Sequence, residues 1–282
     1  MSVPADSDRV CTTFPKVKEV RAYIKDSEKG GQVGQGGDCH DVPTGHWIGG
    51  SAPHMPIANP MSGYEMYEDD RNSWGIGALG SLVVEVETTE GDKGVGVSLG
   101  GEAGCYIVEK HLSRFVEGQN PADIELMWDQ MYKSTINYGR KGLPLQAISA
   151  VDLALWDLLG HLRREPVYQM LGGRTKPYLP VYSTTCDALQ AKKFGFVGAK
   201  IGCPYGPSAG GEGLKKNVEM FKNTRKQVGD EFPLMLDCYM ALTLSYSIQL
   251  ARELKDLKFK WIEEALPPDD YQGYRELTSV CR

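Results

Sequence analysis

The sequence predicts an α/β protein in which an α+β region is followed by alternating strands and helices. Its 282 residues, 41% hydrophobic and 24% charged, have the composition of a globular protein with a sizeable core. The first half combines alternating strand patterns with amphipathic helices. From Tyr178 onward, a short apolar run is followed by a helical pattern four times. The length fits one large domain or two ordinary ones.

Strand patterns open the first region. The stretch KVKEVRAYI, residues 16–24, alternates apolar and polar side chains, as a half-buried strand does. Residues 81–101 contain two strand-like runs around a turn rich in Gly and Asp, which predicts a hairpin. Residues 26–72 between them are rich in Gly, Pro, His and Tyr. A loop of this length is usually functional or disordered, and the His and aromatic content favours a functional loop.

Helical spacing of apolar side chains follows the hairpin. It predicts helices within 104–118, 121–136 and 144–173. The third has a broad Ala/Leu-rich face and should pack in the core; Pro166 and a Gly pair follow it. We place the domain boundary near Leu143–Gly173, where the third helix bridges the two domains, and take the domains as residues 1–142 and 143–282.

The second region repeats a strand and a helix. The strand-like runs are residues 178–185, 196–202, 232–239 and 258–266. They are continuously apolar, which is typical of parallel strands buried on both faces beneath covering helices. An open parallel sheet and a segment of a (β/α) barrel both fit this pattern.

Carboxylates end two of these neighbouring strands. Asp237 and Glu263 lie 26 residues apart, one strand–helix repeat, so both fall at the carboxyl ends of adjacent parallel strands. Barrel enzymes place catalytic groups at that edge. Carboxylate oxygens without a Cys/His set suit Mg²⁺, whose charge would offset the repulsion between the acids. A solvated strand end leading into a loop is the alternative, because Asp and Glu are common residues.

Charge and cysteine content exclude several classes. The net charge of −6 and the pI near 5.5 argue against a nucleic-acid partner. No run of about 18 apolar residues predicts a membrane span, and the polar, acidic N-terminus is not a signal or transit peptide. Seven cysteines, an odd number without a CxxC pair, fit reduced thiols in a cytoplasmic protein.

Long motifs in the chain resemble a known family. These motifs are AISAVDLALWDLLGHLRREPVYQMLGG, then LMLDCYM, then WIEEALPPDDYQGYREL. They resemble the mandelate racemase/muconate lactonizing branch of the enolase superfamily. Within that branch the resemblance is closest to the L-rhamnonate dehydratases, and it extends through GDCHDVPTGHWIGG to nearly the whole chain.

This resemblance implies an α+β capping domain followed by the first half of a modified (β/α) barrel. It implies a Mg²⁺ held by three acids, of which Asp237 matches the first and Glu263 the second, with Glu264 a neighbour. The implied activity is that of a hydro-lyase: a sugar-acid dehydratase that removes the proton α to the carboxylate and eliminates the β-hydroxyl to give a 2-keto-3-deoxy acid. Mg²⁺ stabilises the charge that the weakly acidic α-proton leaves behind.

Two capping-loop residues match substrate-binding positions of the dehydratases. These are His40 in CHDVP and Arg71 in DDRNSWG. An Arg can hold a carboxylate or hydroxyls through its planar donor fork. Apart from the resemblance, His40 also fits an ordinary loop histidine, and Arg71 a surface ion-pair partner. Lys200 ends the second strand, where related enzymes carry a catalytic Lys; the usual K-x-K is absent, so it fits a charge facing the substrate or a surface Lys.

The chain departs from the family pattern at its C-terminal end. It stops 19 residues past Glu263, so the third metal acid, the later catalytic His and the acid that supports that His are expected to be missing. No general acid or base is assigned for this reason. The alternative to an active dehydratase is therefore a truncated, catalytically inactive remnant. We expect a small sugar-acid substrate, little turnover by the 282-residue chain itself and activity in a longer version; homo-oligomerisation and the sugar's stereochemistry stay open.

Overall fold

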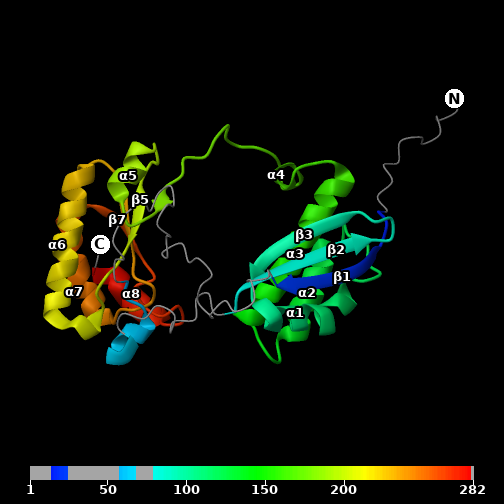
Figure 1. The fold of residues 1–282 in the computed structure, drawn as a ribbon, viewed down its shortest axis with the longest axis horizontal. Coiled ribbons are helices and arrows are strands. Elements are labelled where there is room, and N and C mark those ends of the chain that lie inside the picture. The colour runs from blue at the N-terminus through cyan, green and yellow to red at the C-terminus, as the bar shows by residue number, and fades with distance from the viewer. Residues whose placement is uncertain (1–13, 25–56, 68–78, 281–282) are drawn as a thin grey trace. The chain divides into compact units, whose positions relative to one another are not determined.

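A computed structural model describes residues 14–24, 57–67 and 79–280 (Figure 1). The chain divides into two compact units. Unit 1 comprises residues 1–31 and 79–177, and unit 2 comprises residues 32–78 and 178–282. Unit 1 holds an antiparallel sheet with helices and unit 2 a parallel sheet with helices, which confirms the predicted α/β class.

The sheet of unit 1 has the strand order β1-β2-β3 and is antiparallel throughout. Its strands are β1 (Val17–Ile24), β2 (Ser81–Thr88) and β3 (Lys93–Leu99). The strand predicted at 16–24 and the hairpin predicted at 81–101 are both confirmed. In β2 every second side chain is buried, as the alternating sequence requires of a sheet with one face on a core.

Helices cover one face of this sheet. They are α1 (Gly101–Lys110), the short 3₁₀ helix η4 (Leu112–Phe115), α2 (Ile124–Thr135), α3 (Leu143–Arg163) and the single turn α4 (Val167–Met170). The helix predicted within 104–118 is thus two elements, since α1 ends at Lys110 and η4 begins at Leu112, with His111 as the capping residue between them. The core of unit 1 gathers buried side chains of β2, α1, α2 and α3.

The contact between α3 and β3 depends on two glycines. A Cβ at Gly94 would lie 2.2 Å from the Ala154 carbonyl oxygen, and a Cβ at Gly96 would lie 2.0 Å from the Ala150 carbonyl oxygen. The helix backbone therefore rests directly on the strand. Within the described residues α3 is the one helix long and apolar enough to cross a membrane, and half of its most apolar stretch is buried in this packing.

We expect Gly96→Ala to lower the free energy of unfolding of unit 1 by about 2 kcal/mol, because an added methyl forces helix and strand apart. Urea denaturation followed by circular dichroism measures this. Gly211→Ala is the matched control, since no atom lies within 4 Å of the Cβ it would add. An unchanged midpoint in Gly96→Ala would contradict the close contact.

The compact units divide the chain at a different place from the sequence-based boundary between 142 and 143. The helix α3 packs on β3 and β2, so unit 1 continues to Pro177. The broad apolar face read from the sequence is the face that covers this sheet.

The sheet of unit 2 has the order β4-β5-β6-β7, and each neighbouring pair is parallel. Its strands are β4 (Ser183–Thr184), β5 (Ala199–Gly202), β6 (Leu234–Asp237) and β7 (Phe259–Glu263). The run at 178–185 forms a strand over two residues only. The other three predicted strands are present with shorter bounds.

Helices alternate with these strands as predicted. They are α5 (Ala188–Lys193), α6 (Gly210–Val228), α7 (Leu244–Leu254) and α8 (Tyr271–Val280), with 3₁₀ turns η5 (Pro207–Ala209) and η6 (Lys255–Leu257). Figure 1 shows α6 and α7 side by side along the sheet. Phe221 of α6 and Leu250 of α7 are fully buried against Leu234 and Leu236 of β6. The short helices η1 (Pro60–Gly63) and η2 (Glu65–Tyr67) also belong to unit 2.

Candidate metal centre

The carboxyl ends of β6 and β7 bring the two predicted metal ligands together. The strand register pairs Asp237 directly with Glu263. Paired residues of neighbouring strands point to the same face of a sheet, so both carboxylates lie on one side of this edge. Asp237 is buried, with 4% of its surface exposed. The structure thus places the two acids as the sequence predicted; their role as ligands stays a prediction.

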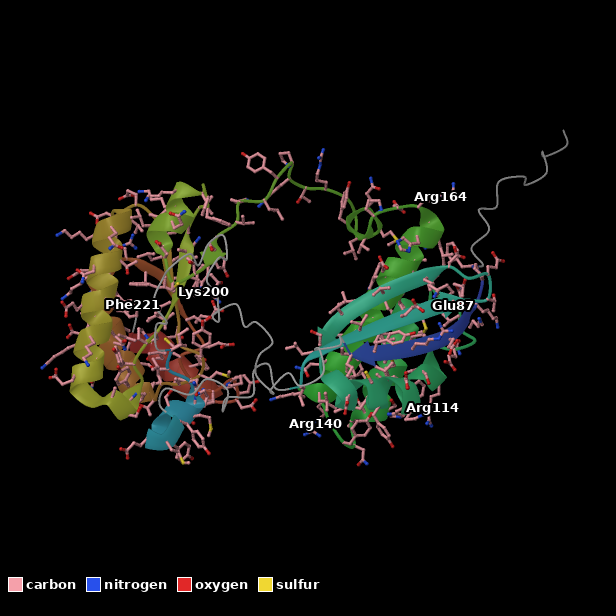
Figure 2. All side chains as sticks on the ribbon, viewed as in Figure 1. Glu87, Arg114, Arg140, Arg164, Lys200 and Phe221 are labelled. Carbon is pink, nitrogen blue, oxygen red and sulfur yellow. The ribbon has the colours of Figure 1, made fainter. Side chains whose placement is uncertain are left out.

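Lys200 of β5 lies between the two acids. Its Nζ is 2.8 Å from Asp237 Oδ2 and 2.7 Å from Glu263 Oε1. The Lys200 side chain is 12% exposed. Figure 2 labels it on unit 2. The ammonium offsets the repulsion that two adjacent carboxylates would otherwise feel in a poorly hydrated place. The sequence left Lys200 as a substrate-facing or surface charge, and the structure pairs it with both acids instead.

A usable signal for this pairing was present in the sequence. Ala199 and Ile201 of β5 are buried in the helix-covered core, whereas Lys200 points to the opposite face. Lys200 pairs in register with Met235, two residues before Asp237 on the same face of β6. The alternation of β5 therefore directs Lys200 to the side of the sheet that carries the acids.

Further hydrogen bonds hold both carboxylates in place. The indole Nε1 of Trp261 donates to Glu263 Oε2 at 2.9 Å, and the Tyr239 backbone N–H donates to Asp237 Oδ1 at 3.2 Å. Trp261 is itself set edge-on against the ring of Tyr182, with 5.6 Å between centroids. Each acid therefore has one oxygen on Lys200 and the other on a fixed donor.

Charge pairing shifts the pKa values of this group. Burial alone would lower the pKa of Lys200, but its hydrogen bonds to Asp237 and Glu263 raise the pKa above the ordinary value. Burial opposes ionisation of Glu263, yet hydrogen bonds from Lys200 and Trp261 leave its pKa below the ordinary value. For the neighbouring Glu264, burial and then the charges of Asp237 and Glu263 raise the pKa.

The backbone after each acid is held in an unusual conformation. Tyr239, Met240 and Glu264 have φ values of 49°, 61° and 47°, in the left-handed region that side chains with a Cβ rarely adopt. Hydrogen bonds connect the two turns: the Cys238 N–H donates to the Glu263 carbonyl at 2.9 Å, and the Met240 N–H to the Glu264 carbonyl at 2.6 Å. The two strand ends thus form one interlocked piece of backbone.

The donor set of this group fits a hard divalent cation. Two carboxylates already converge on one position held by a positive charge, and oxygen donors of this kind suit Mg²⁺. Among the described residues, no group of three or more His, Cys, Asp or Glu side chains forms a metal site. Asp237 and Glu263 are therefore the two acids that would hold the ion, and Lys200 would have to release an oxygen of each.

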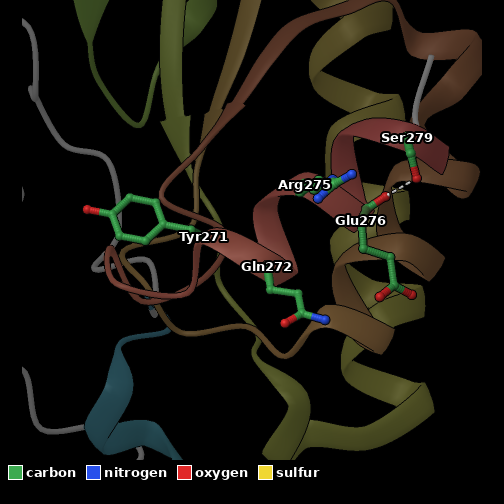
Figure 3. A pocket seen from close by; sticks show the side chains of 5 residues that line it. All are labelled: Tyr271, Gln272, Arg275, Glu276 and Ser279. Carbon is green, nitrogen blue, oxygen red and sulfur yellow. Dashed lines mark hydrogen bonds between the residues drawn. The ribbon is translucent and has the colours of Figure 1, made fainter.

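The two predicted substrate-binding residues, His40 and Arg71, lie outside the described residues. A surface hollow of about 590 Å³ runs along α8, between the side chains of Tyr271, Gln272, Arg275, Glu276 and Ser279 (Figure 3). None of the three charged groups of the metal centre lines it.

Two family models match the chain. Residues 78–172 match the mandelate racemase / muconate lactonizing enzyme N-terminal domain. Residues 185–282 match the enolase C-terminal domain-like family. Apart from residue 78, the first match lies in unit 1, and the second lies in unit 2.

Solved structures similar to the chain include two of rhamnonate dehydratase from Gibberella zeae. One, complexed with Mg, is 45% identical with a TM-score of 0.85, over 95% of this chain and 64% of that one. The other is 42% identical with a TM-score of 0.82, over 95% and 62%. A racemase from Streptomyces coelicolor with bound magnesium is 33% identical, with a TM-score of 0.64 over 71% and 63%. The chain thus spans less than two thirds of the length of each.

Proposed function

The chain belongs to the mandelate racemase / muconate lactonizing enzyme family of the enolase superfamily, and on this basis we propose that it functions as a Mg²⁺-dependent sugar-acid dehydratase of L-rhamnonate dehydratase type. The observation that supports the proposal most strongly is the 45% identity, over 95% of the chain, to the rhamnonate dehydratase complexed with Mg. The reaction removes the proton α to the carboxylate and expels the β-hydroxyl, giving a 2-keto-3-deoxy acid.

Asp237 and Glu263 would hold the ion in this proposal. When bound, Mg²⁺ supplies Lewis-acid stabilisation for charge that develops on the substrate carboxylate. Trp261 and the Tyr239 backbone N–H keep one oxygen of each acid fixed, so the remaining oxygens stay aimed at one position. Fixed supporting groups of this kind are what give a metal site its geometry.

Lys200 contributes charge rather than proton transfer. Its raised pKa keeps it an ammonium at neutral pH, and an ammonium cannot accept the α-proton. It can instead orient an anionic substrate near the carboxyl ends of the strands. No residue within 14–24, 57–67 and 79–280 is assigned as the general base. His40 and Arg71 remain the proposed substrate contacts from the capping loops.

A non-catalytic member of the same family is the second candidate. It is favoured by the finding that the described residues supply two candidate ligands and no cluster of three. Such a protein would bind a divalent cation weakly and would form no product from a sugar acid.

An assay of the purified 282-residue chain separates the two candidates. We expect slow, Mg²⁺-dependent formation of a 2-keto-3-deoxy acid from a panel of sugar acids, fastest with L-rhamnonate and absent in Asp237→Asn. Slow turnover is expected because no general base is assigned among the described residues, and loss of such a group typically costs about 10²–10⁴-fold in rate. Mg²⁺ binding without product would support the second candidate. Product formation that persists in EDTA would contradict both.

A further inference from the structure

Asn217 is a buried polar residue that the proposed chemistry does not use. It lies on α6, and none of its surface is exposed. A buried amide is costly unless its donors and acceptor are all satisfied, so its partners show what it holds. All of them lie in or against the loop that leaves β5 at the carboxyl edge of the sheet.

The side chain of Asn217 binds both backbone polar groups of one loop residue, Tyr205. Its Oδ1 accepts from the Tyr205 N–H at 3.1 Å, and its Nδ2 donates to the Tyr205 carbonyl at 2.7 Å. Nδ2 also lies 3.1 Å from the Tyr246 hydroxyl and 3.4 Å from Cys203 Sγ. The Tyr246 hydroxyl donates to the same Tyr205 carbonyl at 3.1 Å. The loop 203–206 is thus fixed to α6 through the Asn217 amide and to α7 through the Tyr246 hydroxyl.

The loop 203–206 also contacts the segment 57–63, which is distant in the sequence. The Ala58 N–H donates to the Cys203 carbonyl at 2.9 Å, while the Cys203 N–H donates to the Asp237 carbonyl at 2.8 Å. Ile57 packs so closely on Gly202 that a Cβ there would lie 3.2 Å from its Cδ1. The backbone of Cys203 therefore links the end of β6, which carries Asp237, to the segment 57–63.

The segment 57–63 is itself internally fixed. Asn59 is buried, its Oδ1 accepts from the Met61 N–H at 2.8 Å, and its own N–H donates to Ser62 Oγ at 3.1 Å. This capping box starts η1. A segment that is ordered within itself moves as a piece, so its place over the carboxyl edge depends on the few bonds that attach it.

We infer that Asn217 is a positioning residue for the segment 57–63: through the loop 203–206, it holds this segment beside the carboxyl ends of β5 and β6. We call the hydrogen bonds between Asn217 and Tyr205 the clamp. The inference rests on the proposed function for the role of the site, whereas the clamp itself is observed in the structure. The segment is attached to Cys203, just after β5, whereas Asp237 and Glu263 are carried by β6 and β7. Loss of the clamp should therefore release the segment without removing the metal ligands.

Hydrogen–deuterium exchange of the full chain, read by mass spectrometry, tests the clamp. In Asn217→Leu we expect exchange of peptides covering 57–63 and 203–206 to accelerate by at least roughly tenfold, because their attaching bonds are lost. Tyr246→Phe removes one hydroxyl from the same network and should give a smaller acceleration in the same peptides. Val218→Ala, a buried neighbour on α6 outside this network, is the control and should leave these peptides close to wild type.

Mg²⁺ titration of the same variants distinguishes positioning from general weakening. We expect the Mg²⁺ affinity of Asn217→Leu to stay within about threefold of wild type, since both ligands remain. Unchanged exchange of 57–63 would overturn the inference, and so would acceleration throughout unit 2 together with loss of Mg²⁺ binding. If Asn217→Leu does not fold, Tyr246→Phe decides by the same two peptides. Failure of the wild-type chain to bind Mg²⁺ would defeat the proposed function while leaving the exchange result valid.

Discussion

Asp237→Asn is expected to abolish measurable Mg²⁺ binding and with it any dehydratase turnover. The substitution removes an anionic oxygen from a site with two candidate ligands and leaves a buried amide facing the Lys200 ammonium. Loss of a group that merely supports a ligand costs about 10–100-fold in metal affinity, so loss of a ligand itself should exceed roughly a hundredfold. Isothermal titration calorimetry with Mg²⁺ measures the change.

Asp230→Asn is the matched control for this experiment. It makes the same chemical change at an exposed aspartate of the turn after α6, outside the metal centre. Its Mg²⁺ affinity should equal that of the wild type. We expect Glu263→Gln to behave like Asp237→Asn, since the two acids act together. Equal affinity in wild type and Asp237→Asn would remove the metal assignment from this residue.

Lys200→Met is expected to destabilise unit 2 and to make its stability depend on Mg²⁺. Without the ammonium, the buried Asp237 faces Glu263 with no cation between them. Removing one partner of a buried ion group costs about 3–5 kcal/mol. Because one third of the Glu263 side chain is exposed and partly screened, we expect about 3 kcal/mol. Urea denaturation with and without Mg²⁺ measures both effects.

Added Mg²⁺ should restore more stability to Lys200→Met than it adds to the wild type. An ion that binds only the folded state stabilises it by about 2.7 kcal/mol at a hundred times its dissociation constant. In the wild type Mg²⁺ has to displace Lys200 from both carboxylates, whereas in the variant it meets uncompensated charge. Lys258→Met is the control, because Lys258 pairs across 3.9 Å with an exposed Glu231. An identical Mg²⁺ effect in wild type and Lys200→Met would refute the competition.

Periodicity predicted most of the fold. Alternation identified β1 and the hairpin, and continuous apolar runs identified the parallel sheet of unit 2. Element ends were less predictable, because they depend on where backbone hydrogen bonds stop: the apolar run at 178–185 forms a strand only at Ser183–Thr184, where β5 offers partners. The partner of α3 also could not be read from one sequence, since an apolar face does not say which sheet it covers.

The candidate site, like the fold, was predicted from the sequence only in part. The spacing of Asp237 and Glu263 predicted adjacent strand ends, and the register confirms that placement. Lys200 was underestimated because its contacts come from two other strands: the alternation of β5 indicates the face of the sheet on which Lys200 lies, but not its partners. Asn217 gave no signal, since a single Asn on an amphipathic helix reads as surface. The cytoplasmic location, the substrate contacts His40 and Arg71, and homo-oligomerisation stay predictions.

Two residues with positive φ that follow the acids, Met240 and Glu264, matter for any attempt to raise the thermal stability of this chain. Met240 and Glu264 each occupy a backbone conformation that costs an L-residue roughly 1–2 kcal/mol and glycine almost nothing. Glycine at either position would therefore relieve local strain in the folded chain. It would also give the unfolded chain more freedom and let the turn behind Asp237 and Glu263 sample other shapes. Selection for a higher melting temperature thus works against a fixed orientation of Asp237 and Glu263 at these two positions. A screen that ranks variants by melting temperature alone would favour glycine there and lose the backbone conformation that orients the two acids.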